Sequence, residues 1–467
     1  MIDLSQEDGE GNAMSYATIL ADFIANTNYE NIPAETINLA KERLLDTIGA
    51  MIAGRAGWAY GDDLIEAMKP LGVGTSPVLG PDRESRFPAA RAAMLDATFA
   101  HAIELDDGHT FAGVHAGAVV VPTALIMGEE LGASGKEVLT AIVLGYETVY
   151  RMAVAQSPQL IDHGFHPSAT CDTVGAMAVA GKLMKLDAQR LANGLGMSAL
   201  QAAGLMEATV SGQQSKCVMV GNAAYAGICC TYVARAGLEG STTAFDGKTG
   251  LFQAMSKPIQ GEEALKDLGK PFWIGNTYVK FYPTCRHAQP AIEAALNLAE
   301  KNGIRPEQVE RIDVGTHRVA YELTGVIHAP QNSGEAKFSI AYGIAAALAD
   351  HGVAVRHLTE PYYTDEKYLT TAEKVTTTID EQVNALYPKR RGAKVTIYLK
   401  DGSACTEECY DLKGSPQNPV GFEELRNKFI VAATGLLSDD AIQAVQQKCA
   451  ALEQEESISN LLSLLNW

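Results

Sequence analysis

The chain has 467 residues, of which 47% are hydrophobic and 20% charged, a balance that excludes a disordered or collagen-like protein. Its 37 basic and 56 acidic side chains give a formal net charge of −19. Such a surface repels phosphate backbones and anionic lipids, and the densest basic stretch, at 389–394, is short. We therefore expect no nucleic-acid partner and no membrane partner.

The cysteines and the first residues bear on the compartment. Eight cysteines form no CxxC pair, which disfavours structural zinc and iron–sulfur clusters. Residues 1–13 are polar and acidic, so we expect a disordered lead-in rather than a signal peptide. Apolar stretches are interrupted by Gly, Glu or Lys before about 20 residues, so none is predicted to span a membrane. These features predict a soluble, cytoplasmic protein with reduced cysteines.

Helical periodicity dominates residues 14–268, which we interpret as one all-helical domain. Pro33 and Gly54 bracket a first long helix, and Ser134 with Glu137 forms a capping box that opens another, running to about Ala155. Further helices are predicted over 90–104, 119–131, 169–185, 187–206 and 221–237. Several carry Gly and Ala on more than one face, so we expect a buried layer of closely packed helices.

The pattern changes near Pro271, and residues 269–420 are predicted to form a smaller α+β domain. Two helices are expected there, over 286–303 and 335–350. The predicted strands cover 308–316, 375–380, 393–399 and 404–410, with Asp401-Gly402 as the hairpin turn between the last two. Residues 421–467 are helical again. The expected fold is mainly α: a large helical domain, a smaller α+β domain, and a C-terminal segment that returns to the helical domain.

Four stretches at predicted helix ends combine histidine, lysine and acidic residues: 101–117, 163–171, 211–224 and 279–290. Helix N-termini bind carboxylates, and a nearby lysine or arginine would add charge-assisted hydrogen bonds. Each stretch also has a purely structural interpretation. Asp106-Asp107 is a common turn pair, and Lys216, expected just before the helix at 221, could be a solvated surface lysine.

Metal and cofactor chemistry is disfavoured by the motifs. His109 and His115, with Asp106 or Asp107, loosely resemble a ligand set, but their spacing matches no helical metal motif. No GxGxxG follows a predicted strand, no phosphate-binding GxxxxGK[ST] occurs, and no GxSxG elbow is present. We therefore expect chemistry without a metal or a cofactor.

Five stretches, in this order, resemble the MmgE/PrpD family: HAIELDDGH, GFHPSATCDTVGAM, LANGLGMSALQAAGLME, SGQQSKCVMVGNAA and KFYPTCRHAQPAIEAAL. The resemblance covers about residues 15–460. The family includes 2-methylcitrate dehydratase, cis-aconitate decarboxylase and iminodisuccinate epimerase. It implies a helical domain with an α+β lid domain, a homodimer, and no required metal or cofactor.

The resemblance also implies site residues. The catalytic candidates are Asp106, Asp107, His115, His166, Lys216 and, from the second domain, Tyr342. The substrate-binding candidates are Lys280, which the resemblance implies, and Arg286 and His109, which come from the polar stretches at 279–290 and 101–117. The histidines can act as general acid and base, one of them oriented by an aspartate, while the cations hold carboxylates and stabilise developing negative charge.

The expected function is a lyase that acts on a small di- or tricarboxylate. Dehydration of the 2-methylcitrate type is favoured, with decarboxylation as the close alternative and epimerisation third. The family's dehydratases carry a different acidic loop from the Glu-Leu-Asp-Asp-Gly-His of this chain, so the substrate stays open. A non-catalytic homologue that has kept the fold is the alternative from another class.

Overall fold

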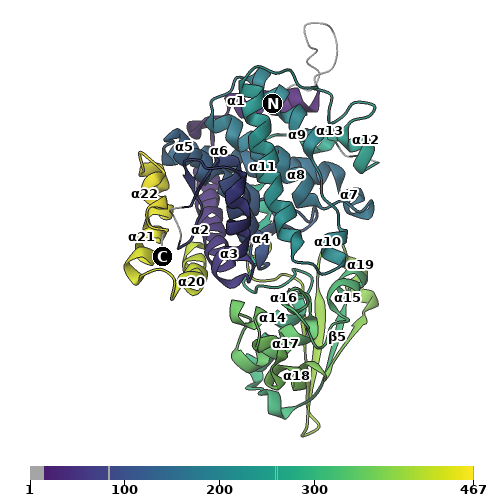
Figure 1. The fold of residues 1–467 in the computed structure, drawn as a ribbon. Coiled ribbons are helices and arrows are strands. Elements are labelled where there is room, and N and C mark those ends of the chain that lie inside the picture. The colour runs from purple at the N-terminus through teal and green to yellow at the C-terminus, as the bar shows by residue number, and fades with distance from the viewer. Residues whose placement is uncertain (1–14, 82–84, 258, 260, 466) are drawn as a thin grey trace.

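The computed structural model describes residues 15–81, 85–257, 259, 261–465 and 467, so the predicted lead-in at 1–13 lies outside the described residues. Figure 1 shows a large helical domain above a smaller domain that holds the main sheet. The mainly α fold predicted from the sequence is confirmed, since helices dominate and strands are few and short.

The helices of the large domain follow the predicted order. They are α1 (Tyr16–Asn26), α2 (Ala34–Gly57), α3 (Gly61–Met68), α4 (Ala89–Ala102), α5 (Gly117–Leu131), α6 (Gly135–Gln156), α7 (Gln159–Asp162), α8 (Pro167–Leu183), α9 (Ala188–Gln201), α10 (Glu207–Val210), α11 (Ser215–Arg235), α12 (Leu251–Met255) and α13 (Gly261–Leu265). The predicted capping box of Ser134 and Glu137 opens α6, with the Ser134 N–H donating to the Glu137 carboxylate at 2.9 Å. Two short ribbons, β1 (Ser76–Pro77) with β2 (Arg86–Phe87) and β3 (Gly108–His109) with β4 (Thr277–Tyr278), are antiparallel.

Glycines set the distance between the central helices. A Cβ added at Gly221 of α11 would lie 2.5 Å from the carbonyl oxygen of Met94 on α4. One added at Gly227 would lie 2.5 Å from the carbonyl oxygen of Thr173 on α8. Only glycine permits so close an approach, and the expectation of closely packed, small-residue helices is confirmed. The same packing brings the start of α11 beside the end of α4.

The smaller domain is built on a four-stranded sheet in the order β6-β5-β7-β8. Its strands are β5 (Val309–Thr316), β6 (Val375–Ile379), β7 (Ala393–Leu399) and β8 (Ala404–Cys409); its helices are α14 (Gln289–Asn302), α15 (Arg318–Thr324), α16 (Ser333–Lys337), α17 (Ile340–Asp350), α18 (Glu366–Ala372) and α19 (Glu381–Leu386). β5 pairs with β6 in parallel, and the other pairs are antiparallel. The predicted hairpin joins β7 to β8 through Asp401 and Gly402, and Gly402 has φ +87°.

The C-terminal segment returns to the large domain, as predicted. It contains α20 (Phe422–Ala433), α21 (Asp439–Ala450) and α22 (Ser459–Leu462), which lie beside α2 and α5 in Figure 1. The Gly135 N–H donates to the Glu455 carbonyl at 2.9 Å, and the Ile458 N–H donates to the Ala133 carbonyl at 3.0 Å. These bonds anchor the segment to the start of α6.

Three helix boundaries differ from the prediction. The helix expected over 187–206 ends at Gln201, and the helix expected over 221–237 begins earlier, at Ser215. The single helix expected over 335–350 is two helices, because Ser339 caps a new one by accepting the Tyr342 N–H at 2.9 Å. Hydrophobic periodicity continues through such a break, so it does not show where the second helix starts.

Two helices, α6 and α11, are long and apolar enough to cross a membrane by length and composition alone. The protein buries 94% of the apolar window of α6 and 56% of that of α11. Burial inside the fold is the position of a core helix, which agrees with the expectation that neither spans a membrane.

Candidate active site

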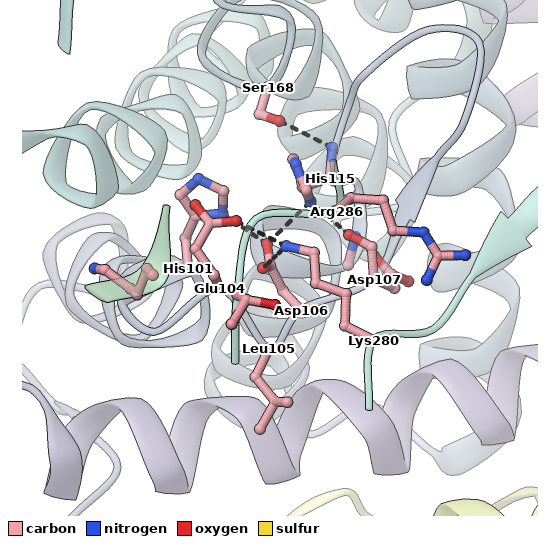
Figure 2. A network of polar contacts seen from close by, with 12 residues as sticks. His101, Glu104, Leu105, Asp106, Asp107, His115, Ser168, Lys280 and Arg286 are labelled. Atoms are coloured by element: carbon pink, nitrogen blue, oxygen red, sulfur yellow. Dashed lines mark hydrogen bonds and ion pairs between the residues drawn. The ribbon is translucent and has the colours of Figure 1, made fainter. Parts of the chain in front are cut away.

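A cluster of charged side chains lies buried where the large domain meets the smaller one. Glu104 and Asp106 come from the loop that follows α4, and Lys280 follows β4. The short pairing of β3 with β4 holds these two segments together, with Gly108 opposite Tyr278. Figure 2 shows the Lys280 ammonium group between the two carboxylates.

Two lysines share one glutamate. Lys280 Nζ lies 2.9 Å from Glu104 Oε2 and 3.1 Å from Asp106 Oδ1, and Lys216 Nζ bonds Glu104 Oε1. Glu104 has φ +56°, a left-handed conformation that non-glycine residues seldom adopt. This conformation ends α4 and places the Glu104 carboxylate between the two ammonium groups, so backbone strain coincides with a candidate functional group.

The ammonium groups keep both carboxylates ionised. Burial acts to raise the pKa of Glu104, but Lys216 and Lys280 outweigh it and hold that pKa well below its ordinary value. Burial likewise opposes ionisation of Asp106, and Lys280 with His101 holds the pKa of Asp106 below its usual range. Lys280 is completely buried, and although burial favours its neutral form, Asp106 and Glu104 raise its pKa.

Asp107 faces a different environment from Asp106. Its Oδ1 accepts the N–H of Gly117 at 3.0 Å at the start of α5, and its Oδ2 accepts the Tyr146 hydroxyl. Burial raises the pKa of Asp107 to about 7, and the nearby carboxylates of Asp46 and Asp106 add to that shift. Asp107 thus fixes the 104–117 loop to α5 and α6 through these hydrogen bonds, whereas Asp106 belongs to the charged cluster.

Three histidines surround the charged cluster. The His101 ring lies 5.1 Å from the His115 ring and 6.1 Å from the His166 ring, measured between centroids. His101 Nδ1 lies 2.6 Å from Asp106 Oδ2, and its Nε2 is buried with no partner among the described residues. His115 Nδ1 lies 2.7 Å from the Asp107 carbonyl oxygen.

These contacts assign the tautomers. Because their Nδ1 atoms face acceptors, His101 and His115 carry the proton on Nδ1 and leave Nε2 as a free base. His166 is the N-cap of α8, and its Nδ1 accepts the Ala169 N–H at 3.4 Å, so a neutral His166 carries its proton on Nε2. The site therefore holds two candidate proton acceptors and one N–H donor.

Burial and the lysine charges keep the three imidazoles neutral at physiological pH. Burial lowers the pKa of His115 to about 3, and Lys280 contributes to that shift. Burial followed by the charge of Lys216 lowers the pKa of His101, and the same two causes hold the pKa of His166 well below its ordinary value. Neutral imidazoles beside ammonium groups are suited to acid–base chemistry on an anionic substrate.

A small pocket with a cavity volume of about 20 Å³ opens onto this cluster. His101, Glu104, Lys216 and Lys337 line it together with the 208–214 loop and Phe338. Lys337 Nζ donates to the Ala102 carbonyl oxygen at 2.8 Å and thereby satisfies the end of α4.

The structure brings together five of the predicted site residues: Asp106, His115, His166, Lys216 and Lys280. His109 and Arg286 line a second pocket instead, and the Tyr342 hydroxyl donates to the His357 carbonyl at 2.9 Å inside the smaller domain. Three further residues of the site, His101, Glu104 and Lys337, were given no role from the sequence, although the first two lie in the polar stretch at 101–117. The lysines were a signal for Glu104, because a buried ammonium group requires an acid as its partner.

The sequence predicts that Lys216 precedes its helix, and this is wrong. Lys216 lies in the first turn of α11. Its ion-pair partner is Glu104. The interpretation of Lys216 as a solvated surface residue does not hold, since its side chain is 12% exposed and ion-paired.

A metal ion would compete with bonds already made. Of the described residues, His101, Asp106 and His115 bring possible ligand atoms within 4.8 Å of one another. Both histidines already use Nδ1 in hydrogen bonds, and Lys280 occupies the second oxygen of Asp106. The arrangement is therefore better suited to proton transfer than to cation binding.

His166 should contribute to both rate and stability. Its capping bond to the Ala169 N–H predicts that His166→Ala loses about 1 kcal/mol of unfolding free energy. His166→Asn keeps a capping oxygen and removes the imidazole. We expect its thermal melt to stay near that of the wild type while turnover falls about 10²–10⁴-fold. Normal turnover of the asparagine variant would exclude His166 from the chemistry.

The sequence matches one protein family and several named enzymes along most of its length. Residues 18–263 match the MmgE/PrpD N-terminal domain, and residues 282–452 match the MmgE/PrpD C-terminal domain. A cis-aconitate decarboxylase of Aspergillus terreus is 26% identical over 500 residues, which cover 99% of this chain and 98% of that protein. The cis-aconitate decarboxylase of Mus musculus is 26% identical over 92% of this chain and 89% of its own length, and that of Homo sapiens is 25% identical over 92% and 90%.

Proposed function

Because the chain belongs to the MmgE/PrpD family, we propose that it is a cofactor-independent carboxy-lyase acting on a small unsaturated tricarboxylate such as cis-aconitate. The sequence alone favoured dehydration. The relatives that align along nearly the whole chain are named cis-aconitate decarboxylases, and this moves decarboxylation ahead. A cytoplasmic location is part of the proposal, supported by eight cysteines that are all free.

One observation carries the proposal: Lys216 and Lys280 bind the same glutamate beside the pocket. A substrate carboxylate that enters the pocket can replace Glu104 as the partner of Lys216, while Lys280 stays paired with Asp106. Lys337 adds a third ammonium group to the pocket wall. Three cations against two carboxylates leave an excess positive charge that a polycarboxylate would neutralise.

Decarboxylation makes simple demands on these groups. The bond between a carbon and its carboxylate breaks, CO₂ leaves, and the electron pair stays on the carbon skeleton, spread onto a remaining carboxylate. Lys216 and Lys280 can stabilise that negative charge. A proton must then reach carbon, and an ammonium group or an imidazolium at His101, held by Asp106, can deliver it.

Dehydration is the second candidate, and the free Nε2 atoms of His101 and His115 favour it. Eliminating water from a hydroxy acid requires a base to remove a proton from carbon and an acid to protonate the leaving hydroxyl. Two neutral imidazoles with unprotonated Nε2 can supply the base. Decarboxylation has no need of one.

Product analysis by NMR separates these reactions. Purified protein is incubated with cis-aconitate, 2-methylcitrate and citrate in parallel. We expect CO₂ and a five-carbon dicarboxylate from cis-aconitate. A six- or seven-carbon unsaturated acid from citrate or 2-methylcitrate would favour the dehydratase, and tight binding with no product would favour a non-catalytic homologue.

Substrate binding should be accompanied by proton uptake. In the empty site, burial and the lysine charges hold the pKa values of His101, His115 and His166 below their ordinary range. A bound polycarboxylate brings negative charge beside them and raises those pKa values. The complex then holds more protons than the free protein, so affinity should fall as the pH rises through the raised histidine pKa values of the complex. Calorimetry in buffers of different ionisation enthalpy measures the uptake; proton release on binding would contradict it.

We also propose that the chain forms a homodimer. Large apolar side chains are exposed on three helices of the large domain, among them Leu200 of α9 (67%), Val210 of α10 (66%) and Val233 of α11 (39%). Burial of exposed apolar side chains by a second copy would stabilise such a dimer. Light scattering after gel filtration should give twice the chain mass of 49.7 kDa. A monomer at micromolar concentration would argue against this assembly.

A further inference from the structure

A second pocket lies beside the charged cluster but is lined by different residues. It has a volume of about 490 Å³ and lies between the 109–111 segment of the large domain and segments 389–391 and 410–417 of the smaller domain. Arg391 spans the two domains, since its guanidinium donates to the Thr110 carbonyl oxygen. The Tyr278 ring, which contacts His115 at a centroid distance of 6.4 Å, also contacts the Arg286 guanidinium at 4.3 Å.

The charge of this pocket is opposite to that of the protein. Its lining contains four cations, Arg286, Lys389, Arg390 and Arg391, and one acid, Asp411, which pairs with Arg390. Within the described part of the chain, Arg286, Lys389 and Arg391 have no carboxylate partner. For a chain with net charge −19, three unpaired cations at one pocket are a concentrated source of positive potential.

Arg286 is the least expected of these groups because it is only 6% exposed. Its hydrogen bonds come from Nη1, to the Gln289 side chain at 2.9 Å and to the Val279 carbonyl at 3.5 Å, and both partners are neutral. In Figure 2 the guanidinium points away from the carboxylates of Asp106 and Glu104. A buried guanidinium without an anion is costly, which suggests that an anion from outside completes it.

Two buried polar atoms in the same lining also lack a partner among the described residues. The Oγ of Ser415, a residue only 6% exposed, makes no hydrogen bond, and neither does the buried Nε of Arg391. His109 adds a possible donor: its Nδ1 accepts the Ala112 N–H at 3.1 Å, so its proton sits on Nε2. Buried groups without partners call for a ligand or an ion.

We propose that this pocket is a second binding site, separate from the catalytic pocket, for a small oxyanion with two or more negative charges. Arg391, Arg286 and Lys389 supply the charge, and Ser415 supplies a hydroxyl donor. A phosphate and a free polycarboxylate share the chemistry that this lining recognises. Because Arg391 already bridges the domains, an anion bound there links the 109–111 segment to the smaller domain.

The test uses the full chain carrying Lys216→Met, which weakens carboxylate binding in the catalytic pocket. Calorimetry at low ionic strength measures the affinity for inorganic phosphate and, separately, for tricarballylate, a saturated tricarboxylate. Adding Arg391→Gln should weaken the affinity for the anion at least tenfold, and adding Ser415→Ala should weaken that affinity to a smaller degree. Arg318→Gln is the matched control, because it removes one charge from an exposed side chain of the same domain.

Binding of either anion with this pattern supports the site, and the probe that binds identifies the source of the ligand. If Arg391→Gln fails to fold, Lys389→Gln, which changes an exposed side chain, replaces it in the same experiment. We expect Lys389→Gln to lower the affinity for the anion severalfold. The proposal is overturned if neither anion binds, or if Arg391→Gln and Lys389→Gln match Arg318→Gln. It is also overturned if phosphate binds the wild type but not the Lys216→Met protein, since the anion would then occupy the catalytic pocket. None of these outcomes depends on which reaction the enzyme catalyses.

Discussion

Replacing Lys216 with methionine should remove catalysis and leave the fold intact. Methionine keeps the length and the apolar stem of the side chain, and Glu104 retains Lys280 as its partner at 2.9 Å. The lost ammonium group is the one that a substrate carboxylate can take over from Glu104. We expect kcat to fall about 10²–10³-fold, and substrate affinity to fall with it.

Lys185→Met is the matched control for this experiment. Lys185 is exposed and pairs with Glu137 at 2.9 Å, so the substitution also removes one charge and one ion pair, but far from the pocket. Steady-state kinetics and a thermal melt should show normal values for Lys185→Met and a loss of activity alone for Lys216→Met. Equal kinetics in the two variants would mean that Lys216 serves packing only.

Replacing Lys280 with methionine should have the largest effect on stability. Lys280 is completely buried and is bonded to both Glu104 and Asp106, so its loss leaves two buried carboxylates short of a counter-charge. Breaking a buried ion pair by removing one partner typically costs about 3–5 kcal/mol. Urea denaturation should show this loss, and Lys301→Met, which removes an exposed pair with Glu407, should show little.

The pH dependence of that loss has a definite sign. In the wild type the pKa values of Asp106 and Glu104 are depressed, so their stabilisation is present above the unfolded values of about 4 and is lost as the pH falls from there toward the lower folded values. Without Lys280 much of this depression disappears. The difference in unfolding free energy between variant and wild type should therefore stay constant from about pH 7 to about pH 5 and narrow as the pH falls below about 4. A difference that stays constant in acid as well would show that the cost is one of packing.

Local signals in the sequence predicted most of the fold. The capping box at Ser134, the hairpin at Asp401-Gly402 and the small residues of α11 each depend on chemistry within a few residues. The break between α16 and α17 did not show in the periodicity, because the apolar pattern continues while Ser339 forms a new cap. The early start of α11 was missed because its N-cap is Gln214, which makes no side-chain capping hydrogen bond, so no Ser, Thr, Asp or Asn cap marks the start of the helix.

The site was predicted less completely because it depends on contacts between distant segments. Lys280 lies 176 positions from Glu104 in the chain, and no local pattern relates them. Glu104 was overlooked because the neighbouring Asp106-Asp107 pair is the more conspicuous acid, and only the left-handed backbone at 104 explains why it points to the lysines. Tyr342 was placed by resemblance alone, and its position inside the smaller domain follows from its bond to His357.

The most direct test gives cis-aconitate, labelled with ¹³C, to the purified and chelator-treated protein and follows the carbon atoms by NMR. The proposed function predicts that CO₂ and a five-carbon dicarboxylate appear in equal amounts with the wild type and with Lys185→Met, and that both are nearly absent with Lys216→Met. Failure of the wild type to convert cis-aconitate would contradict the proposed carboxy-lyase, and undiminished conversion by Lys216→Met would contradict the assignment of its site.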